Sequence, residues 1–98
     1  MKLMTETIEK QLPKLYAQEE SKEPKAYVKY FCPWNNWTWY GMEYDGKDTF
    51  FGYVKGLSNE YGYFSLAELE SLKGPYGLGI ERDKFFQATP VEQVKEDN

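Results

Sequence analysis

Residues 37–55 predict an antiparallel β-hairpin, and this hairpin limits the folds that the chain can adopt. Both arms carry aromatic residues in alternation with smaller or polar ones, and Asp45-Gly46-Lys47-Asp48 between them is typical of a hairpin turn. A two-residue loop would place Glu43 opposite an aspartate, and like charges directly opposite each other are unfavourable. We therefore expect a four-residue loop in which Tyr44 pairs with Thr49.

The expected register divides the side chains between two faces, because alternate residues of a strand point to opposite sides. It pairs Glu43 with Phe50, Met42 with Phe51, Gly41 with Gly52, Tyr40 with Tyr53 and Trp39 with Val54. The first face, expected to lie in the core, carries Trp37, Trp39, Phe50 and Val54. The second face carries Tyr40, Met42, Tyr44, Phe51 and Tyr53. We expect this second face either to lie under a helix of the protein or to meet a partner, and a slip of one residue would exchange the two faces.

The other segments predict an α+β fold. Further strands are expected at residues 26–32, 61–64 and 80–88. Helices are expected at residues 5–12 and 65–72, with a helical turn near the end of the sequence. The predicted architecture is an antiparallel sheet of about four to five strands with short helices packed on one face.

We expect one domain over residues 1–98, because a chain of this length rarely forms two. Its expected parts are an N-terminal helix and extension (1–16), a sheet core (26–88) with a short helix (65–73), and a frayed tail (95–98). Two capping boxes mark helix starts, Ser65 with Glu68 and Thr89 with Glu92, the second having proline at the first helical position.

The apolar residues are unusually aromatic. Nine Tyr, six Phe and three Trp stand against 14 Leu, Ile and Val together. At about 150–250 Å² of surface each, these rings are more than a small core buries easily, so some should reach the surface and form a contact site. Trp34, in the turn Pro33-Trp34-Asn35-Asn36, is the ring that we most expect to be exposed.

Charge and residue counts argue against several functional classes. The net charge is −4 and Arg82 is the single arginine, so we expect no basic groove for nucleic acid. The absence of histidine removes the Ser–His and Cys–His nucleophile pairs and the commonest zinc ligand. Cys32 is the single cysteine, which suits a reducing cytosol, and no apolar stretch approaches a membrane span. We expect a cytoplasmic, non-enzymatic protein without a cofactor or bound metal.

The candidate sites have simpler structural explanations beside them. Glu43, Asp45 and Asp48 could form a cation or acid–base site, but turn chemistry explains them better because the EF-hand spacing is missing. Cys32 lacks a neighbouring base and is expected to be buried, with a metal site that combines it with carboxylates as an alternative. Trp34 and its two asparagine neighbours could instead bind a glycan or another small ligand by stacking. The predicted partner-binding residues are Trp34, Asn35, Asn36, Tyr40, Tyr44, Tyr53, Glu43, Asp45 and Asp48.

Five segments carry a resemblance to a known family: LPKLY (12–16), NWTWY (36–40), DTFFG (48–52), GYFSLAELE (62–70) and GPYGLGIERD (74–83). Together they resemble a family of small bacterial proteins that is catalogued as a domain of unknown function. The resemblance extends from Leu12 to Val94 and brings no catalytic residues with it.

The resemblance implies a biological context, because members of that family occur on phages, plasmids and integrative elements. Small acidic proteins of such elements often bind and block a host defence complex, as anti-CRISPR and anti-restriction proteins do. The implied function is a protein-binding inhibitor that acts in the bacterial cytoplasm, with a Cas9-type (type II) nuclease as the expected partner. An acidic protein would be steered by charge toward such a basic nuclease.

Overall fold

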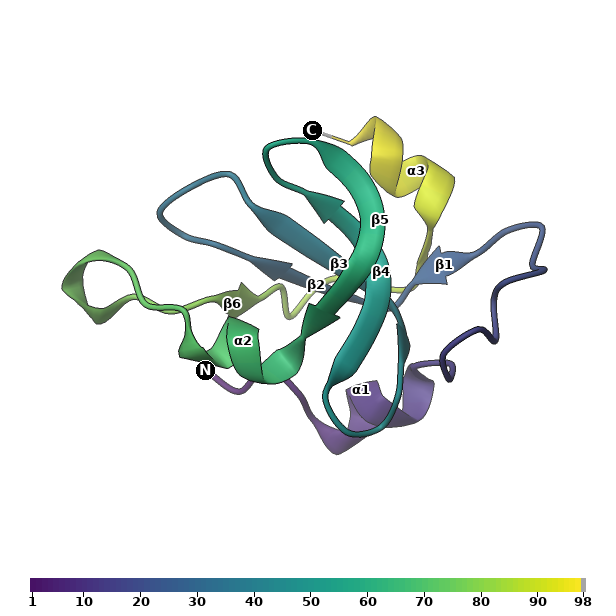
Figure 1. The fold of residues 1–98 in the computed structure, drawn as a ribbon, viewed down its shortest axis with the longest axis horizontal. Coiled ribbons are helices and arrows are strands. Elements are labelled where there is room, and N and C mark those ends of the chain that lie inside the picture. The colour runs from purple at the N-terminus through teal and green to yellow at the C-terminus, as the bar shows by residue number, and fades with distance from the viewer. Residues whose placement is uncertain (98) are drawn as a thin grey trace.

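A five-stranded antiparallel sheet forms the centre of the protein in the computed structural model, which describes residues 1–97 (Figure 1). The strand order is β5-β4-β3-β2-β6. These strands are β2 (Val28–Phe31), β3 (Thr38–Tyr44), β4 (Thr49–Lys55), β5 (Asn59–Ser65) and β6 (Glu81–Arg82). A second sheet pairs β1 (Lys25–Ala26) with β7 (Thr89–Pro90). The predicted α+β class with an antiparallel sheet is confirmed.

The segment expected to be one long strand, residues 80–88, forms only the two-residue strand β6 before the chain turns. The Asp83 N–H still donates to the carbonyl of Lys29 (2.9 Å), but the Asp83 side chain accepts a hydrogen bond from the N–H of Phe85 (2.9 Å). A turn closed by an aspartate side chain competes with sheet pairing. The chain therefore leaves the sheet here and pairs again only in β7.

Three short α-helices accompany the sheet: α1 (Glu6–Gln11), α2 (Leu66–Ser71) and α3 (Val91–Glu96), with a 3₁₀ turn η1 (Pro75–Gly77). Thr5 caps α1 and Ser65 caps α2, each by accepting a hydrogen bond from an N–H three residues on. Both starts agree with the sequence prediction.

The second predicted capping box is wrong. Thr89 lies in β7 and its hydroxyl donates to the carbonyl of Gln87 (2.7 Å), while Pro90 occupies the cap position of α3 without a side-chain hydrogen bond. The N–H of Val91 donates to the carbonyl of Pro24 (2.9 Å). A backbone carbonyl next to β1 therefore satisfies the first N–H group of α3.

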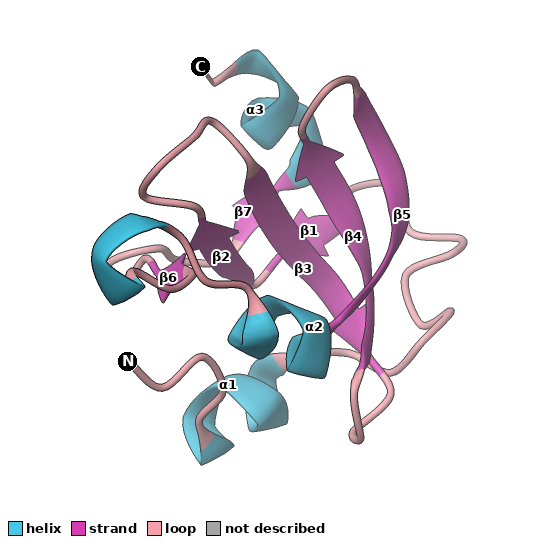
Figure 2. Cartoon of the chain, turned by 60° about the vertical axis from the view of Figure 1, so that its left-hand side comes forward, coloured by secondary structure: helices cyan, strands magenta, loops and turns pink. Residues whose placement is uncertain are grey.

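The helices cover both faces of the sheet (Figures 1 and 2). Helices α1 and α2 pack against the first face, whose core centres on Tyr30 and Phe50, and α3 packs against the second through Val91 and Val94. The expectation of helices on one face holds for α1 and α2 only. The tail expected to fray is helical as far as Glu96, and Asn98 lies outside the described residues.

The hairpin of β3 and β4 has the predicted register at its open end and a different one near the turn. Trp39 pairs with Val54, Tyr40 with Tyr53 and Gly41 with Gly52, as expected. Beyond a β-bulge at Met42, however, Glu43 pairs with Phe51 and Tyr44 with Phe50, so the predicted pairing there is wrong.

The Asp45 side chain explains the longer turn. Its Oδ1 accepts hydrogen bonds from the N–H groups of Lys47, Asp48 and Thr49 (2.8, 2.8 and 3.0 Å), and Gly46 adopts a left-handed conformation (φ 83°). The added turn residue is accommodated by the bulge. As a result Tyr44 moves from the second face to the first, 4.6 Å from Phe50 between ring centroids, and Glu43 moves from the first face to the second, opposite Phe51.

Burial of tyrosine hydroxyls makes the stability of the fold sensitive to alkaline pH. Tyr30 is fully buried, and its hydroxyl donates to the Leu3 carbonyl (2.6 Å). Burial raises the pKa of Tyr30, Tyr40 and Tyr44 above the ordinary value of 10.0.

A group with a raised folded-state pKa contributes stability below its unfolded pKa and loses it as pH rises. We therefore expect the free energy of unfolding, measured by urea denaturation, to fall as the pH rises above 10, with a limiting slope of about 1.4 kcal/mol per pH unit for one tyrosine. Tyr30→Phe should release one proton fewer on unfolding at alkaline pH and should therefore show a shallower fall of stability with pH. An unchanged slope in that variant would contradict the assignment to Tyr30.

Candidate functional site

Three tyrosines that we predicted as contact residues lie inside the protein. Tyr40 and Tyr53 belong to the core cluster beneath α3, and Tyr44 belongs to the cluster on the first face. The centre of the second face is therefore covered by the protein's own helix, and the expectation of a contact surface does not hold for these residues. Burial of their rings, together with the bulge that redirects Tyr44, is the physical reason.

Glu43 is also interior, with 4% of its surface exposed, and it organises a distant loop. Its two carboxylate oxygens accept hydrogen bonds from the N–H groups of Tyr16 and Gln18, both at 2.8 Å. The Gln18 amide in turn donates to the carbonyls of Met42 and Lys25, each at 2.9 Å. Glu43 is therefore a structural anchor that holds the loop between α1 and β1 against the second face.

The two aspartates of the hairpin turn have structural roles. Hydrogen bonds from the amides of Asp48, Lys47 and Thr49 lower the pKa of Asp45. Asp48 accepts hydrogen bonds from the Ser65 hydroxyl and from the N–H of Ala67 (2.8 Å), which ties the turn to the start of α2. Within residues 1–97 the structure contains no group of three or more His, Cys, Asp or Glu side chains placed to hold a metal ion.

Trp34, which we expected to be exposed, is half-buried. Its ring lies directly on Gly74, so that a Cβ atom at that position would overlap it, and it also packs against the core of the first face. Asn35 and Asn36 are exposed, and the Asn35 side chain accepts a hydrogen bond from the N–H of Trp37 (2.8 Å). Trp34 therefore braces the loop that contains Gly74, while Pro33 and the two asparagines of this turn face solvent.

The sequence prediction missed an aromatic groove at the other end of the second face. We call it the tyrosine groove; it has a volume of about 420 Å³ and is lined by Tyr16, Gln18, Glu19, Pro24, Met42, Glu43, Phe51, Tyr61 and Tyr63. Tyr16, Tyr61 and Tyr63 have 65%, 41% and 57% of their surfaces exposed. The alternation in Tyr61-Gly62-Tyr63 was the available signal, since it places both rings on one face of β5 beside Phe51 of β4.

The rings of the tyrosine groove are held by regular structure and by each other. Phe51 stacks on Tyr61 with centroids 6.0 Å apart and planes 4° apart, and it meets Tyr63 edge-on at 5.2 Å. Tyr16 has a left-handed backbone (φ 71°) and is fixed by the hydrogen bond from its N–H to Glu43. The groove is thus formed before any ligand arrives.

The tyrosine groove is acidic. Its lining includes the carboxylates of Glu19 and Glu43 and, among the described residues, no lysine or arginine. The Tyr16 side chain, as a hydrogen-bond partner, raises the pKa of Tyr63, and the charges of Glu43 and Glu19 raise it further. The groove therefore favours a cation.

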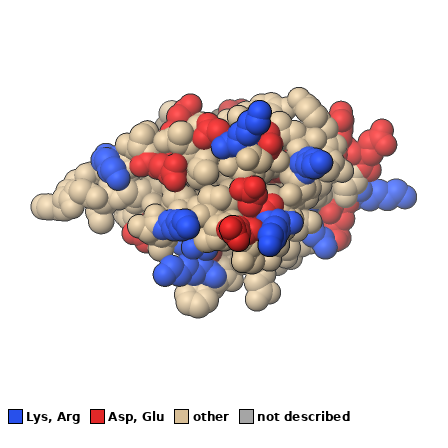
Figure 3. Space-filling model, turned by 90° about the horizontal axis from the view of Figure 1, so that it is seen from below, with Lys and Arg blue, Asp and Glu red and all other residues tan. Residues whose placement is uncertain are grey.

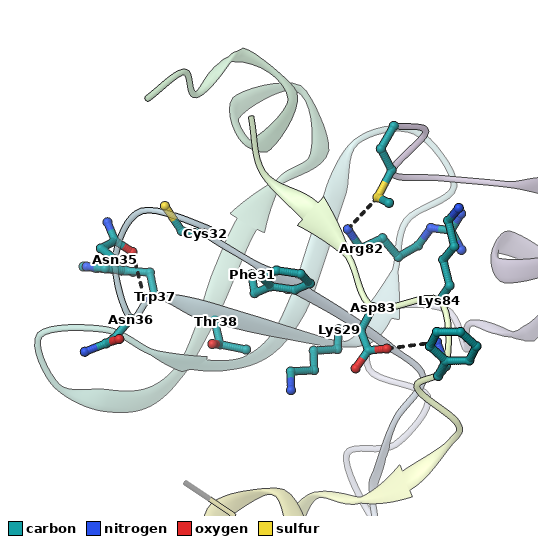
Figure 4. Close-up of a pocket in the computed structure, with 12 residues that line it drawn as sticks. Lys29, Phe31, Cys32, Asn35, Asn36, Trp37, Thr38, Arg82, Asp83 and Lys84 are labelled. Atoms are coloured by element: carbon teal, nitrogen blue, oxygen red, sulfur yellow. Dashed lines mark hydrogen bonds between the residues drawn. The ribbon is translucent and has the colours of Figure 1, made fainter. Parts of the chain in front are cut away.

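A second, larger groove of about 830 Å³ lies at the β2–β6 edge (Figure 4). Figure 4 shows Lys29, Phe31 and Thr38 between the Arg82-Asp83-Lys84 segment and the Asn35-Asn36 turn. Cys32 also lines this groove but is buried, as predicted. Three basic side chains (Lys29, Arg82 and Lys84) and one acidic side chain (Asp83) line this edge groove, so positive charge is in excess there.

Charges are mixed on the face shown in Figure 3, where acidic and basic side chains are interspersed, and several acidic ones lie beside basic ones at the end formed by the loop between α1 and β1. Glu19, Glu20 and Glu23 of that loop are exposed. Glu19 belongs both to this loop and to the lining of the tyrosine groove.

The fold and the groove define a small α+β domain with a preformed, acidic, aromatic-lined surface site. The chain belongs to a family of proteins of unknown function (DUF2958), which matches residues 3–93. No curated protein and no solved structure matches the chain. Among residues 1–97, none of the helices is long and apolar enough to cross a membrane.

Proposed function

We propose that this protein is a non-enzymatic binding protein that captures another protein through the tyrosine groove. The observation that carries the proposal is the gathering of Tyr16, Phe51, Tyr61 and Tyr63 in one open hollow. Tyrosine is enriched in protein interfaces because it offers a large rigid apolar surface and a hydroxyl that remains satisfied in water. The groove is not covered by α3, which packs over the neighbouring Tyr40 and Tyr53 instead.

Rigidity of the groove favours tight association. Tyr61 and Tyr63 sit on a strand paired along its whole length with β4, and Tyr16 is tied to the sheet through Glu43. Ordering flexible side chains and loops costs free energy on binding, so a surface that is already ordered loses less. A few aromatic residues in such a position commonly provide most of the binding energy.

The specific partner that we propose is a host defence nuclease of the Cas9 type, which would make the protein an anti-CRISPR-like inhibitor. The support is the resemblance to proteins of phages, plasmids and integrative elements, together with the acidic groove. Cas9-type nucleases are basic along the channels that hold nucleic acid, so an acidic binder is electrostatically suited to them.

The proposal is tested with the double variant Tyr61→Thr/Tyr63→Thr, which removes both rings and keeps residues that favour strands. With the protein immobilised and guide-loaded Cas9-type nuclease in solution, we expect the wild type to bind and the double variant to lose roughly 30-fold in affinity, as expected for interface aromatics. Target cleavage should be inhibited by the wild type and restored with the variant.

The matched control is Tyr76→Asn, because Tyr76 is fully exposed on the distant η1 loop and asparagine tolerates its left-handed backbone (φ 59°). This control should bind like the wild type. Equal binding by the wild type and the double variant would reject the groove as the site, and no binding or inhibition at micromolar protein would reject the Cas9-type partner.

A further inference from the structure

We infer that the tyrosine groove receives an arginine side chain of its protein partner, an inference that rests on the proposed function. The groove combines exposed aromatic faces with carboxylates, and guanidinium is the group that uses both. Its flat cation stacks on an aromatic ring while its N–H groups donate to carboxylate oxygens.

The first support is the uncompensated charge of Glu43. Both of its carboxylate oxygens accept backbone hydrogen bonds, and the side chain is 4% exposed. Among residues 1–97 the one ion pair joins Lys95 to Glu92, so no cation of the described chain neutralises Glu43. A buried charge without a counter-charge favours an incoming cation.

The second support is that this aromatic cluster already attracts a cation from its other side. The Nζ atom of Lys95, on α3, lies 4.7 Å from the ring centroid of Tyr61. Lys95 does not line the groove, so it leaves the groove side of the cluster available. Arginine fits that side better than lysine, because a compact ammonium cannot stack on a ring and donate in a fork at the same time.

The third support is the volume of the groove and the negative charge of its lining. A volume of about 420 Å³ exceeds one side chain and leaves room for the partner's flanking backbone. Glu19 at the rim and Glu43 at the wall would repel the phosphates of a nucleic acid. The chain's own Arg82 is engaged elsewhere, donating from Nε to the carbonyl of Lys2 (3.1 Å).

The test uses short Gly-Ser peptides that carry one arginine, one lysine or one citrulline, the last having the shape of arginine without its charge. Each peptide is titrated into isotopically labelled full-length protein up to millimolar concentration and followed by NMR. We expect the arginine peptide to shift the amide signals of Tyr16, Tyr61 and Tyr63. The citrulline peptide should bind about tenfold more weakly, as expected for loss of a charge-assisted contact.

Two variants test whether the arginine peptide binds in the tyrosine groove. Glu19→Gln should weaken arginine binding several-fold, whereas Glu60→Gln should leave it unchanged, because Glu60 pairs opposite Val54 and faces the other side of β5. Absence of binding, or equal binding of the arginine and citrulline peptides, would overturn the inference. Preferential binding of a proline-rich peptide at the same signals would overturn it in favour of an extended apolar ligand.

Failure of this inference can be told apart from failure of the proposed function. If capture of the protein partner depends on Tyr61 and Tyr63 but the arginine peptide does not bind, the groove is an interface of another chemistry. If capture does not depend on those rings, the proposed function itself is rejected.

Discussion

Gly52→Ala is expected to lower the free energy of unfolding by about 3 kcal/mol or more, at the upper end of overpacking effects. A Cβ atom at Gly52 would overlap the backbone carbonyl oxygen of Tyr40 on the adjacent strand. No side-chain rotation relieves this contact, because the obstructing atom belongs to the backbone. The strands would have to separate next to the bulge that sets the register of the hairpin.

The matched control is Gly62→Ala. Gly62 lies on β5 directly opposite Gly52 of β4, and a Cβ atom at Gly62 would meet nothing within 4 Å. We expect this variant to change stability by no more than about 0.5 kcal/mol, as for an unobstructed surface position. Chemical denaturation of the two variants measures the difference. Similar losses in both would show that the carbonyl of Tyr40 does not constrain the fold.

Glu43→Ala is the second change with a large expected effect, a loss of about 3 kcal/mol from two hydrogen bonds to a charged group at about 1.5 kcal/mol each. The variant leaves the N–H groups of Tyr16 and Gln18 without their acceptor. Tyr16 then loses the contact that holds its left-handed backbone, which costs roughly 1–2 kcal/mol for a residue with a side chain. We therefore expect the loop between α1 and β1 to open locally before the sheet unfolds.

Hydrogen exchange at the amides of Tyr16 and Gln18 measures this opening directly, and urea denaturation measures the global loss. Glu20→Ala, in the same loop but exposed, is the control and should stay within about 0.5 kcal/mol of the wild type. Glu43→Gln should fall between the two, because its amide group can accept only one of the two hydrogen bonds. Unchanged exchange in Glu43→Ala would contradict the role of Glu43 as anchor.

The two variants connect the fold to the candidate site. The bulge beside Gly52 places Glu43 on the second face, where it fixes Tyr16 and contributes its charge to the tyrosine groove. A defect at either position should therefore reduce partner binding by loosening Tyr16, whereas Tyr61→Thr/Tyr63→Thr should reduce binding by removing the rings themselves while Glu43 still holds Tyr16.

Much of the fold could be predicted because its signals are local. The caps of α1 and α2 depend on residues three apart, and the arms of the β3–β4 hairpin depend on alternation within each strand. The register was correct where two glycines and two tyrosines face each other. It was wrong near the turn, because three amides bonded to Asp45 lengthen the loop and the bulge absorbs the extra residue.

Most of the candidate site could not be predicted from the sequence, because it depends on contacts between segments that are far apart in the chain. Burial of Tyr40 and Tyr53 depends on α3, which lies almost forty residues further along the chain from the nearer of them, and Trp34 is covered by a loop that follows α2. Tyr61 and Tyr63 could have been found by their alternation on β5, but nothing in the neighbouring sequence places Tyr16 beside them.

The amino-acid sequence by itself determined the class of fold, the antiparallel hairpin, two of the helix starts and an excess of aromatic rings. Tertiary structure decided which of those rings are buried and which remain open to a partner. The reason is that caps and alternation act between neighbours, whereas the exposure of a ring depends on what packs over it. Glu43 shows the difference most clearly, since a carboxylate that looks like part of a solvated turn becomes a buried anchor through amides 25 and 27 residues away.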